Sequence, residues 1–497
     1  MKRQFDWRLA GNMVAASGRH LTAAVSGIVT IAMIARRLGV DGLAAWALLG
    51  TASVLLGLSN LGLTTAIYRS GVAGSPERTR RAAGLSLLVV ACAAPLFAVG
   101  IYPLVASLPG ASPALAKDLA RAAPLALLGG VVQAFASPFK AFLLISGNFG
   151  RLARIRFLTA ISQVAVMAAW LSVDASLAGP AAGLLAGALV ELLLTAQAAR
   201  ELDPEIPIRP RLESGRHGAL ASLREGAAQL TVNLAVAAAL RLDVFVLARV
   251  SSLAVVAAYA VASRAVDQSF VLAKQASSAL MPRFGERAAR DHAVLLGSSV
   301  LGGLVASGML ALVLDGRTLL STWAGPVANL PAATLALWLL SSAAILSSLI
   351  EVPASALTVG GRSAWEGAVP LAIGCGVNVA ITFGAASRGG VWAVAGGTVV
   401  GNAVIALLVW HRVRRSFGWS GEQVARAIAP TVAAATTAVL AGLLLAPFSM
   451  RGVLASVFSC LITMVLGCGA AALVATRVLA MRQDALTGPS PSTAGPA

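Results

Sequence analysis

Apolar residues fall along this chain in runs of about twenty, separated by short polar connections. A run of that length crosses the hydrocarbon core of a bilayer as one α-helix. The pattern shows no alternation of apolar and polar residues of the kind that membrane β-barrels carry. We therefore predict an all-α polytopic membrane protein with about fourteen spans, at residues 11–35, 42–67, 83–107, 122–146, 157–176, 179–199, 225–248, 254–281, 293–315, 331–358, 364–385, 390–411, 427–447 and 452–476.

Composition supports a membrane location and sets the predicted orientation. Of the 497 residues, 58% are hydrophobic and 12% are charged, which is about half the charged share of soluble domains. The net charge of +18 could suggest nucleic acid as a partner. However, Lys and Arg gather in alternate connections, which is the positive-inside pattern of membrane proteins. We predict that both termini are cytoplasmic and that the chain binds no nucleic acid.

The two halves of the chain resemble each other. Trp46 corresponds to Tyr259 at an offset of 213, and Arg69 corresponds to Arg283 at an offset of 214. Six spans precede a proline-containing segment, so the second half should repeat the first in the same orientation, about an axis along the membrane normal. We predict an N-lobe (1–200), a cytoplasmic linker (201–224), a C-lobe (225–415), two further helices (416–481) and a disordered cytoplasmic tail (482–497).

The sequence contains no constellation typical of catalysis or of metal binding. Its four cysteines, Cys92, Cys375, Cys460 and Cys468, lie in apolar runs without ligand spacing. Its four histidines are scattered. We predict a transporter rather than an enzyme, with no metal and no cofactor.

Charged residues inside predicted spans are candidates for a transport site, because each is costly in lipid and usually faces a cavity or a partner. The candidate substrate-binding cations are Arg19, Arg264, Lys274, Lys140 and Arg241. Alternatively, Lys140, Lys274 and Arg241 extend to the membrane interface, and Arg264 forms a structural pair with Asp267. A cationic cavity between two lobes would suit an anionic head group, and the planar guanidinium of Arg suits phosphate.

Candidate residues for coupling to H⁺ or Na⁺ are Asp267, Glu191, Glu351 and Asn378. The alternatives are that the glutamates are protonated core residues and that Asn378 bridges helices.

Three stretches resemble the polysaccharide transporter branch of the multidrug/oligosaccharidyl-lipid/polysaccharide exporter superfamily, the O-antigen and exopolysaccharide flippases. They are loose patterns of small and apolar residues rather than sharp motifs: 34–42 with 61–69, 242–283, and 376–397. The chain departs from the family pattern at 249–252, where Arg-Val-Ser-Ser replaces an expected glycine-rich turn.

The resemblance implies a flippase of the bacterial inner membrane. Its substrate would be an undecaprenyl-pyrophosphate-linked oligosaccharide repeat unit, moved from the cytoplasmic to the periplasmic leaflet by ion-coupled alternating access. Arg19 and Arg264 would hold the pyrophosphate. The chain would act as a monomer beside a polysaccharide polymerase and glycosyltransferases. The alternatives are a lipid II flippase, a multidrug antiporter of the same superfamily, a membrane-bound polymerase and a non-transporting scaffold.

Overall fold

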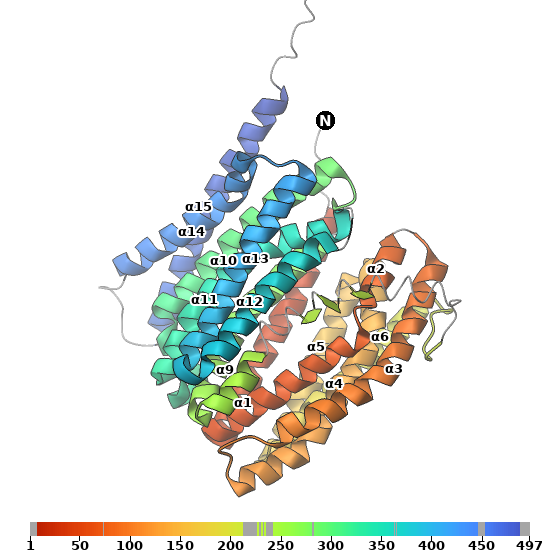
Figure 1. Cartoon of the computed structure of the whole chain (residues 1–497), viewed down its shortest axis with the longest axis vertical. Helices are drawn as coiled ribbons and strands as arrows, with labels where there is room; N and C mark the ends of the chain where they lie inside the picture. The colour runs from red at the N-terminus through yellow and green to blue at the C-terminus, as the bar shows by residue number, and fades with distance from the viewer. Residues whose placement is uncertain are drawn as a thin grey trace, which may run out of the picture.

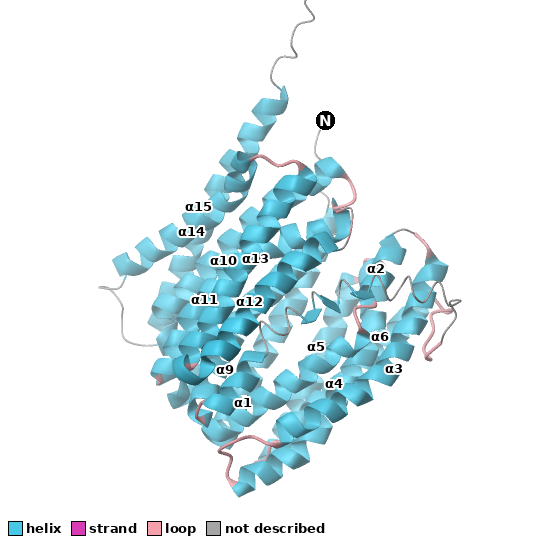
Figure 2. Cartoon of the chain, in the orientation of Figure 1, coloured by secondary structure: helices cyan, strands magenta, loops and turns pink. Residues whose placement is uncertain are grey.

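The computed structural model describes residues 7–72, 74–211, 226–227, 230–231, 233–234, 242–280, 283–361, 363, 365–445 and 453–487. This part of the chain is helical and contains no strand (Figure 2). Its elements are α1 (Trp7–Leu56), η1 (Gly57–Asn60), α2 (Thr64–Val72), α3 (Pro76–Ala106), α4 (Pro113–Ile145), α5 (Phe149–Val173), α6 (Ala178–Leu202), α8 (Asp243–Val250), α9 (Leu253–Leu280), α10 (Arg287–Ala324), η4 (Gly325–Asn329), α11 (Pro331–Gly360), α12 (Trp365–Gly389), α13 (Val391–Phe417), α14 (Gly421–Leu445) and α15 (Val453–Thr487).

The helices coincide with the predicted spans. Within the described residues, eleven helices are long and apolar enough to cross a membrane. The first of these, Val25–Asn60, joins the end of the first predicted span to the second, and most of the seventh span lies outside the described residues. The prediction of an all-α polytopic fold is therefore confirmed.

Helix α1 corrects the predicted loop at residues 36–41. The chain remains helical through Arg36 and Arg37 and bends at Gly39, whose backbone has φ 70° and ψ −164°. This conformation is accessible to glycine because no Cβ clashes with the backbone there. One glycine thus replaces the expected loop between the first two spans.

The second predicted span, 42–67, is also interrupted. Helix α1 passes into η1, and Leu61 and Gly62 then adopt positive φ values of 49° and 75° before α2 begins. The Asn60 side chain stabilises this turn, because its Oδ1 accepts a hydrogen bond from the backbone N–H of Gly62 at 2.8 Å. The Asn60 Nδ2 also donates to Ser137 Oγ of α4 at 3.3 Å, which attaches the turn to the neighbouring helix.

The helices form two bundles that stand side by side (Figure 1). Helices α1–α6 form the N-lobe, in which α6 packs against α4 and α5. Helices α8–α13 form the C-lobe, in which α11 packs against α9 and α13. Helix α1 also runs along α9 and is the main described contact between the lobes. Two polar contacts also join the lobes: the indole N–H of Trp323 donates to Ile28 O at 2.8 Å, and Arg249 donates to Ser107 Oγ at 3.3 Å.

Helices α14 and α15 pack on the outside of the C-lobe, against α10 and against each other. Small residues permit this close approach: a Cβ added to Gly303 of α10 would lie 2.3 Å from the Cβ of Ala471. Helix α15 continues to Thr487, so residues 482–487 of the predicted disordered tail are helical. Residues 488–497 lie outside the described part of the chain.

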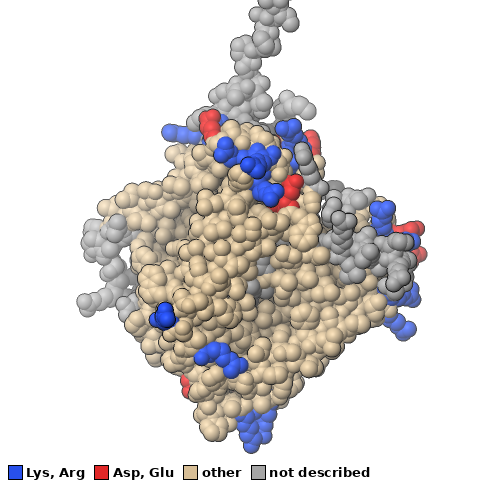
Figure 3. All heavy atoms as spheres, in the orientation of Figure 1, with Lys and Arg blue, Asp and Glu red and all other residues tan. Residues whose placement is uncertain are grey.

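The surface is that of a protein embedded in lipid. Large apolar side chains point outward along the middle of many helices, including Leu96, Leu193, Phe383 and Leu407, which are 62–74% exposed. Charged residues gather towards the ends of the molecule and leave a broad uncharged surface between them (Figure 3). Exposed apolar surface of this extent is unfavourable in water and suits a bilayer.

Candidate functional site

Three of the predicted cationic site residues lie beyond what the structure describes. Arg19 lies in α1 and Lys274 lies in α9, but the placement of their side chains is outside the described part of the chain. Arg241 lies wholly outside the described residues. The roles assigned to these three residues stay predictions.

Arg264 lies at the contact between the lobes. Its side chain is 31% exposed, and its guanidinium would lie 3.3 Å from a Cβ placed on Gly50 of α1. Glycine at this position lets α1 pass directly over the guanidinium. Arg264 and Asp267 form the expected pair on one face of α9, at 3.8 Å between Nη1 and Oδ2. The pair places a cation beside the other lobe, with an anion that is 10% exposed one turn away.

Lys140 and Glu191 are brought together within the N-lobe. Lys140 of α4 lies 3.4 Å from Glu191 Oε1 of α6, and the glutamate side chain is only 9% exposed. From the sequence, Lys140 was predicted to bind the substrate and Glu191 was predicted to bind the coupling ion. Each of the two groups therefore has an opposite charge as its partner.

The other two predicted coupling residues lie on separate helices of the C-lobe. Glu351 lies in α11, where its carbonyl oxygen accepts a hydrogen bond from Ser277 Oγ of α9 at 3.4 Å. Asn378 of α12 is 2% exposed, and its Oδ1 accepts a hydrogen bond from Thr382 Oγ1 at 3.2 Å. These two residues do not form one cluster, so they are separate candidates.

Asn378 faces α13 at a point where the two helices approach very closely. A Cβ on Gly397 would lie 2.9 Å from Asn378 Oδ1 and 3.0 Å from Thr382 Oγ1. A Cβ on Gly401 would lie 2.8 Å from Gly374 O. The glycines therefore allow the polar side chains of α12 to lie directly against the backbone of α13.

The neighbouring residue on α13, Thr398, belongs to a second polar group that the sequence prediction missed. This group centres on Asp243, the first residue of α8, whose side chain is 1% exposed. Asp243 Oδ2 accepts hydrogen bonds from the hydroxyl of Tyr259 and from Thr398 Oγ1, the latter at 3.0 Å. Three helices, α8, α9 and α13, thus meet at one buried carboxylate.

The second oxygen of this carboxylate has no described partner. Asp243 Oδ1 is buried and makes no hydrogen bond within the described part of the chain. A buried carboxylate oxygen without a partner is costly unless it binds a proton, a cation or a water molecule. Hydroxyl, amide and carboxylate oxygens are suitable for binding H⁺ or Na⁺. Asn378 and Thr382 lie against Gly397, the residue before Thr398 on α13, so the two polar groups adjoin and together comprise Asp243, Tyr259, Thr398, Asn378 and Thr382. We call the combined group the C-lobe polar cluster.

The sequence contains only a weak signal for Asp243. The residue lies near the end of the seventh predicted span, two positions after Arg241, and was not among the predicted site residues. Its partner Thr398 is 155 residues away along the chain. The sequence shows an acidic residue in one span and polar residues in two glycine-rich spans. Only the folded structure shows that these residues lie next to each other.

Comparisons with known proteins identify the fold. No family model and no curated protein sequence matches the chain. Among solved structures, it is similar to a mutant of the MATE transporter VcmN of Vibrio cholerae (17% identity, TM-score 0.62), over 84% of this chain and 98% of that one. It is similar to the eukaryotic MATE transporter AtDTX14 (15% identity, TM-score 0.65), over 85% and 97% respectively.

The chain is also similar to the lipid II flippase MurJ in an inward closed conformation (11% identity, TM-score 0.67), over 95% of this chain and 99% of that one. Identities this low show the fold rather than the function. The chain therefore has the two-lobed helical fold that is seen in these MATE transporters and in MurJ.

Proposed function

We propose that this protein is a flippase of the bacterial inner membrane that moves an undecaprenyl-pyrophosphate-linked oligosaccharide repeat unit to the periplasmic leaflet. The two lobes would open alternately to the two sides of the membrane. The observation that carries the proposal is the position of Arg264 on α9, where α9 meets α1 of the other lobe. A guanidinium at this contact can hold phosphate oxygens with paired hydrogen bonds.

The structural similarity extends over more of this chain for MurJ than for the MATE transporters. The MATE structures cover 84% and 85% of this chain, whereas MurJ covers 95% of it. This difference is comparable with the share of the chain that α14 and α15 occupy. A lipid II flippase is accordingly the second candidate function, and a multidrug antiporter is the third.

Ion coupling is part of the proposal, and the C-lobe polar cluster is its site. The buried Oδ1 of Asp243 can take up H⁺ or contribute to a Na⁺ site. A cation bound there would change the packing of α8 against α12 and α13, which are its neighbours in the C-lobe. The predicted coupling residue in the N-lobe, Glu191, fits coupling less well, because it already has Lys140 as a counter-charge.

Removal of the Arg264 guanidinium tests the substrate assignment. We expect Arg264→Ala to lower export of surface polysaccharide roughly ten- to hundredfold, because it removes charge-assisted hydrogen bonds to the pyrophosphate. Export by Arg264→Lys should lie between that of Arg264→Ala and that of the wild type, since lysine keeps the charge and loses the planar guanidinium. Export is measured in cells by immunoblotting of the surface glycan, with the membrane abundance of each variant measured in parallel.

The matched control is Arg414→Ala. Arg414 is exposed in the last turn of α13, so its loss removes the same charge away from the lobe contact. Unimpaired export by Arg264→Ala at normal abundance would show that the pyrophosphate is not held there.

A further inference from the structure

A pocket of about 680 Å³ lies where α3 begins and α6 ends, on the outer side of the N-lobe. Its third wall is the start of the linker that joins the two lobes. The walls carry five arginines and two glutamates: Arg80, Arg81, Arg200, Arg209, Arg211, Glu77 and Glu205. In the proposed orientation this pocket faces the cytoplasm, at the level where the spans leave the bilayer.

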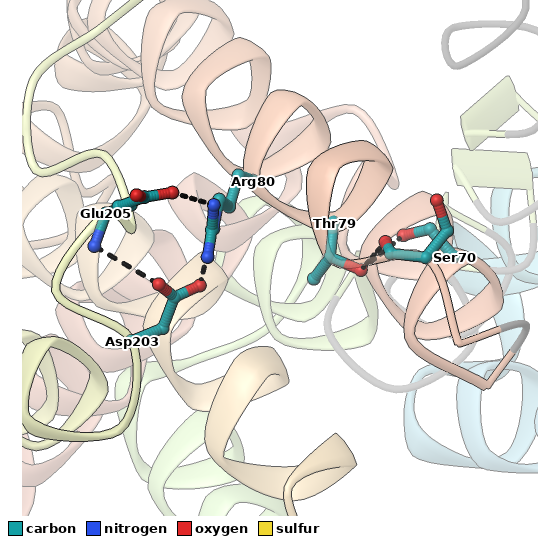
Figure 4. Close-up of polar contacts among 6 residues, drawn as sticks. Ser70, Thr79, Arg80, Asp203 and Glu205 are labelled. Carbon is teal, nitrogen blue, oxygen red and sulfur yellow. Dashed lines mark hydrogen bonds and ion pairs between the residues drawn. The ribbon is translucent and has the colours of Figure 1, made fainter.

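The start of the linker is attached to α3 by hydrogen bonds, so the linker wall of the pocket is held in place. The Arg80 guanidinium donates to Asp203 Oδ2 at 2.7 Å and to Glu205 (Figure 4). Further along, the backbone N–H of Arg211 donates to Gly84 O at 3.3 Å. Glycine at position 84 favours this close approach, because a Cβ there would lie 3.3 Å from Arg211 O. The two attachments hold the linker across the start of α3.

The acidic residues of the pocket are already engaged by two of its arginines. Arg80 is paired with Asp203 and Glu205, and Arg81 is paired with Glu77 at 3.4 Å. Arg200 and Arg209 are exposed and have no carboxylate within 4 Å in the described part of the chain. The pocket therefore presents an excess of guanidinium groups, which suits a phosphate-bearing ligand.

Aliphatic side chains border these arginines. Ile206 and Ile208 of the linker line the pocket, and Ile208 is 47% exposed. A soluble anion gains nothing from aliphatic neighbours, whereas a phospholipid presents a phosphate and hydrocarbon chains together. Basic pockets at the cytoplasmic ends of transmembrane helices are suited to anionic lipid head groups.

We infer that this pocket binds the phosphate of an anionic phospholipid of the inner leaflet. Arg200 and Arg209 contact the phosphate, and Ile208 contacts the upper part of the acyl chains. The lipid would hold the linker at the membrane surface, next to the segment that connects the lobes. The inference goes beyond the proposed function and does not depend on which cargo is moved.

Native mass spectrometry of the purified full chain tests this inference. Phosphatidylglycerol is titrated into the detergent-solubilised protein, with phosphatidylcholine as the uncharged comparison. We expect Arg200→Gln/Arg209→Gln to weaken phosphatidylglycerol binding roughly thirtyfold, because each arginine near an anionic head group contributes about fivefold. Binding of phosphatidylcholine should be unchanged. Millimolar inorganic phosphate should not displace the phosphatidylglycerol.

The matched control is Arg414→Gln/Arg415→Gln, which removes the same charge from exposed positions in α13. This control should keep phosphatidylglycerol binding within about twofold of the wild type. Wild-type affinity in the pocket variant, or an equal loss in the control, would overturn the inference. Displacement of the lipid by inorganic phosphate would also overturn it and would identify a site for a soluble anion. None of these outcomes depends on flippase activity.

Discussion

At the scale of single residues, the buried acidic groups described here have specific partners on other helices or one turn away. Glu191 has Lys140 as its counter-charge, and Asp267 has Arg264. Asp243 instead receives two hydroxyl groups and keeps one oxygen without a described partner. An ion pair lowers the cost of a buried charge, and Asp243 forms none within the described part of the chain. A cation or a proton would therefore act more strongly on Asp243 than on Glu191 or Asp267.

The sequence allowed part of this arrangement to be predicted. Arg264 and Asp267 are three residues apart in one apolar run, so helical periodicity alone places them on one face. Lys140 and Glu191 lie on helices that are separated in the chain, and hydropathy carries no information on which helices are neighbours. For the same reason the C-lobe polar cluster could not be predicted, although Asn378 was recognised as a candidate.

The role of Asp243 can be measured through the dependence of transport on ion gradients. Asp243→Asn keeps the size and the hydrogen-bonding oxygen of the side chain but removes its charge. We expect gradient-driven transport to fall by about tenfold, while the residual transport becomes insensitive to collapse of the proton or sodium gradient. The measurement is the transport rate with and without an ionophore selective for each ion.

Tyr259→Phe is the control for Asp243→Asn, since it removes a hydrogen bond to the carboxylate and leaves the charge in place. It should retain gradient dependence. If Asp243→Asn transports at the wild-type rate and still responds to the gradient, the coupling site lies elsewhere.

At the scale of helices, hydropathy predicted where the chain crosses the membrane, and glycines determined how the helices bend and pack. The bend of α1 at Gly39 depends on a single positive φ, which a hydropathy pattern does not record. Close packing of α12 on α13 and of α15 on α10 depends on particular glycines that face a neighbour. Whether a glycine faces lipid or a neighbouring helix cannot be read from its residue type.

Two glycines of α15 allow a direct test of this packing. A Cβ on Gly467 would lie 2.4 Å from Ser307 Oγ and 3.2 Å from Ala434 O, whereas a Cβ on Gly469 would meet nothing within 4 Å. We expect Gly467→Val to destabilise the protein by about 1–3 kcal/mol through overpacking. Gly469→Val should have little effect. Thermal unfolding of the two purified variants in detergent measures the difference, and equal unfolding temperatures would contradict the assigned packing of α15.

At the scale of the whole molecule, the fold places two helical lobes beside each other with α1 as the main described contact between them. The weak internal repeat in the sequence suggested the two lobes, and the resemblance to flippases suggested how they would be used. A lipid-linked glycan cargo would leave no comparable signal, because its sugar contacts would be spread over many residues. In the proposed mechanism, Arg264 is the described residue that would hold the pyrophosphate of the cargo.

The most direct test is translocation by the purified protein in proteoliposomes. Vesicles are loaded in parallel with a fluorescent undecaprenyl-pyrophosphate-linked oligosaccharide, with lipid II and with a cationic dye, and the appearance of each on the opposite side is followed. We predict that the wild type accelerates movement of the lipid-linked oligosaccharide well above protein-free vesicles, that Arg264→Ala does not, and that the dye is not moved. Preferential movement of lipid II would favour the second candidate function, whereas transport of the dye without either lipid would contradict the flippase assignment.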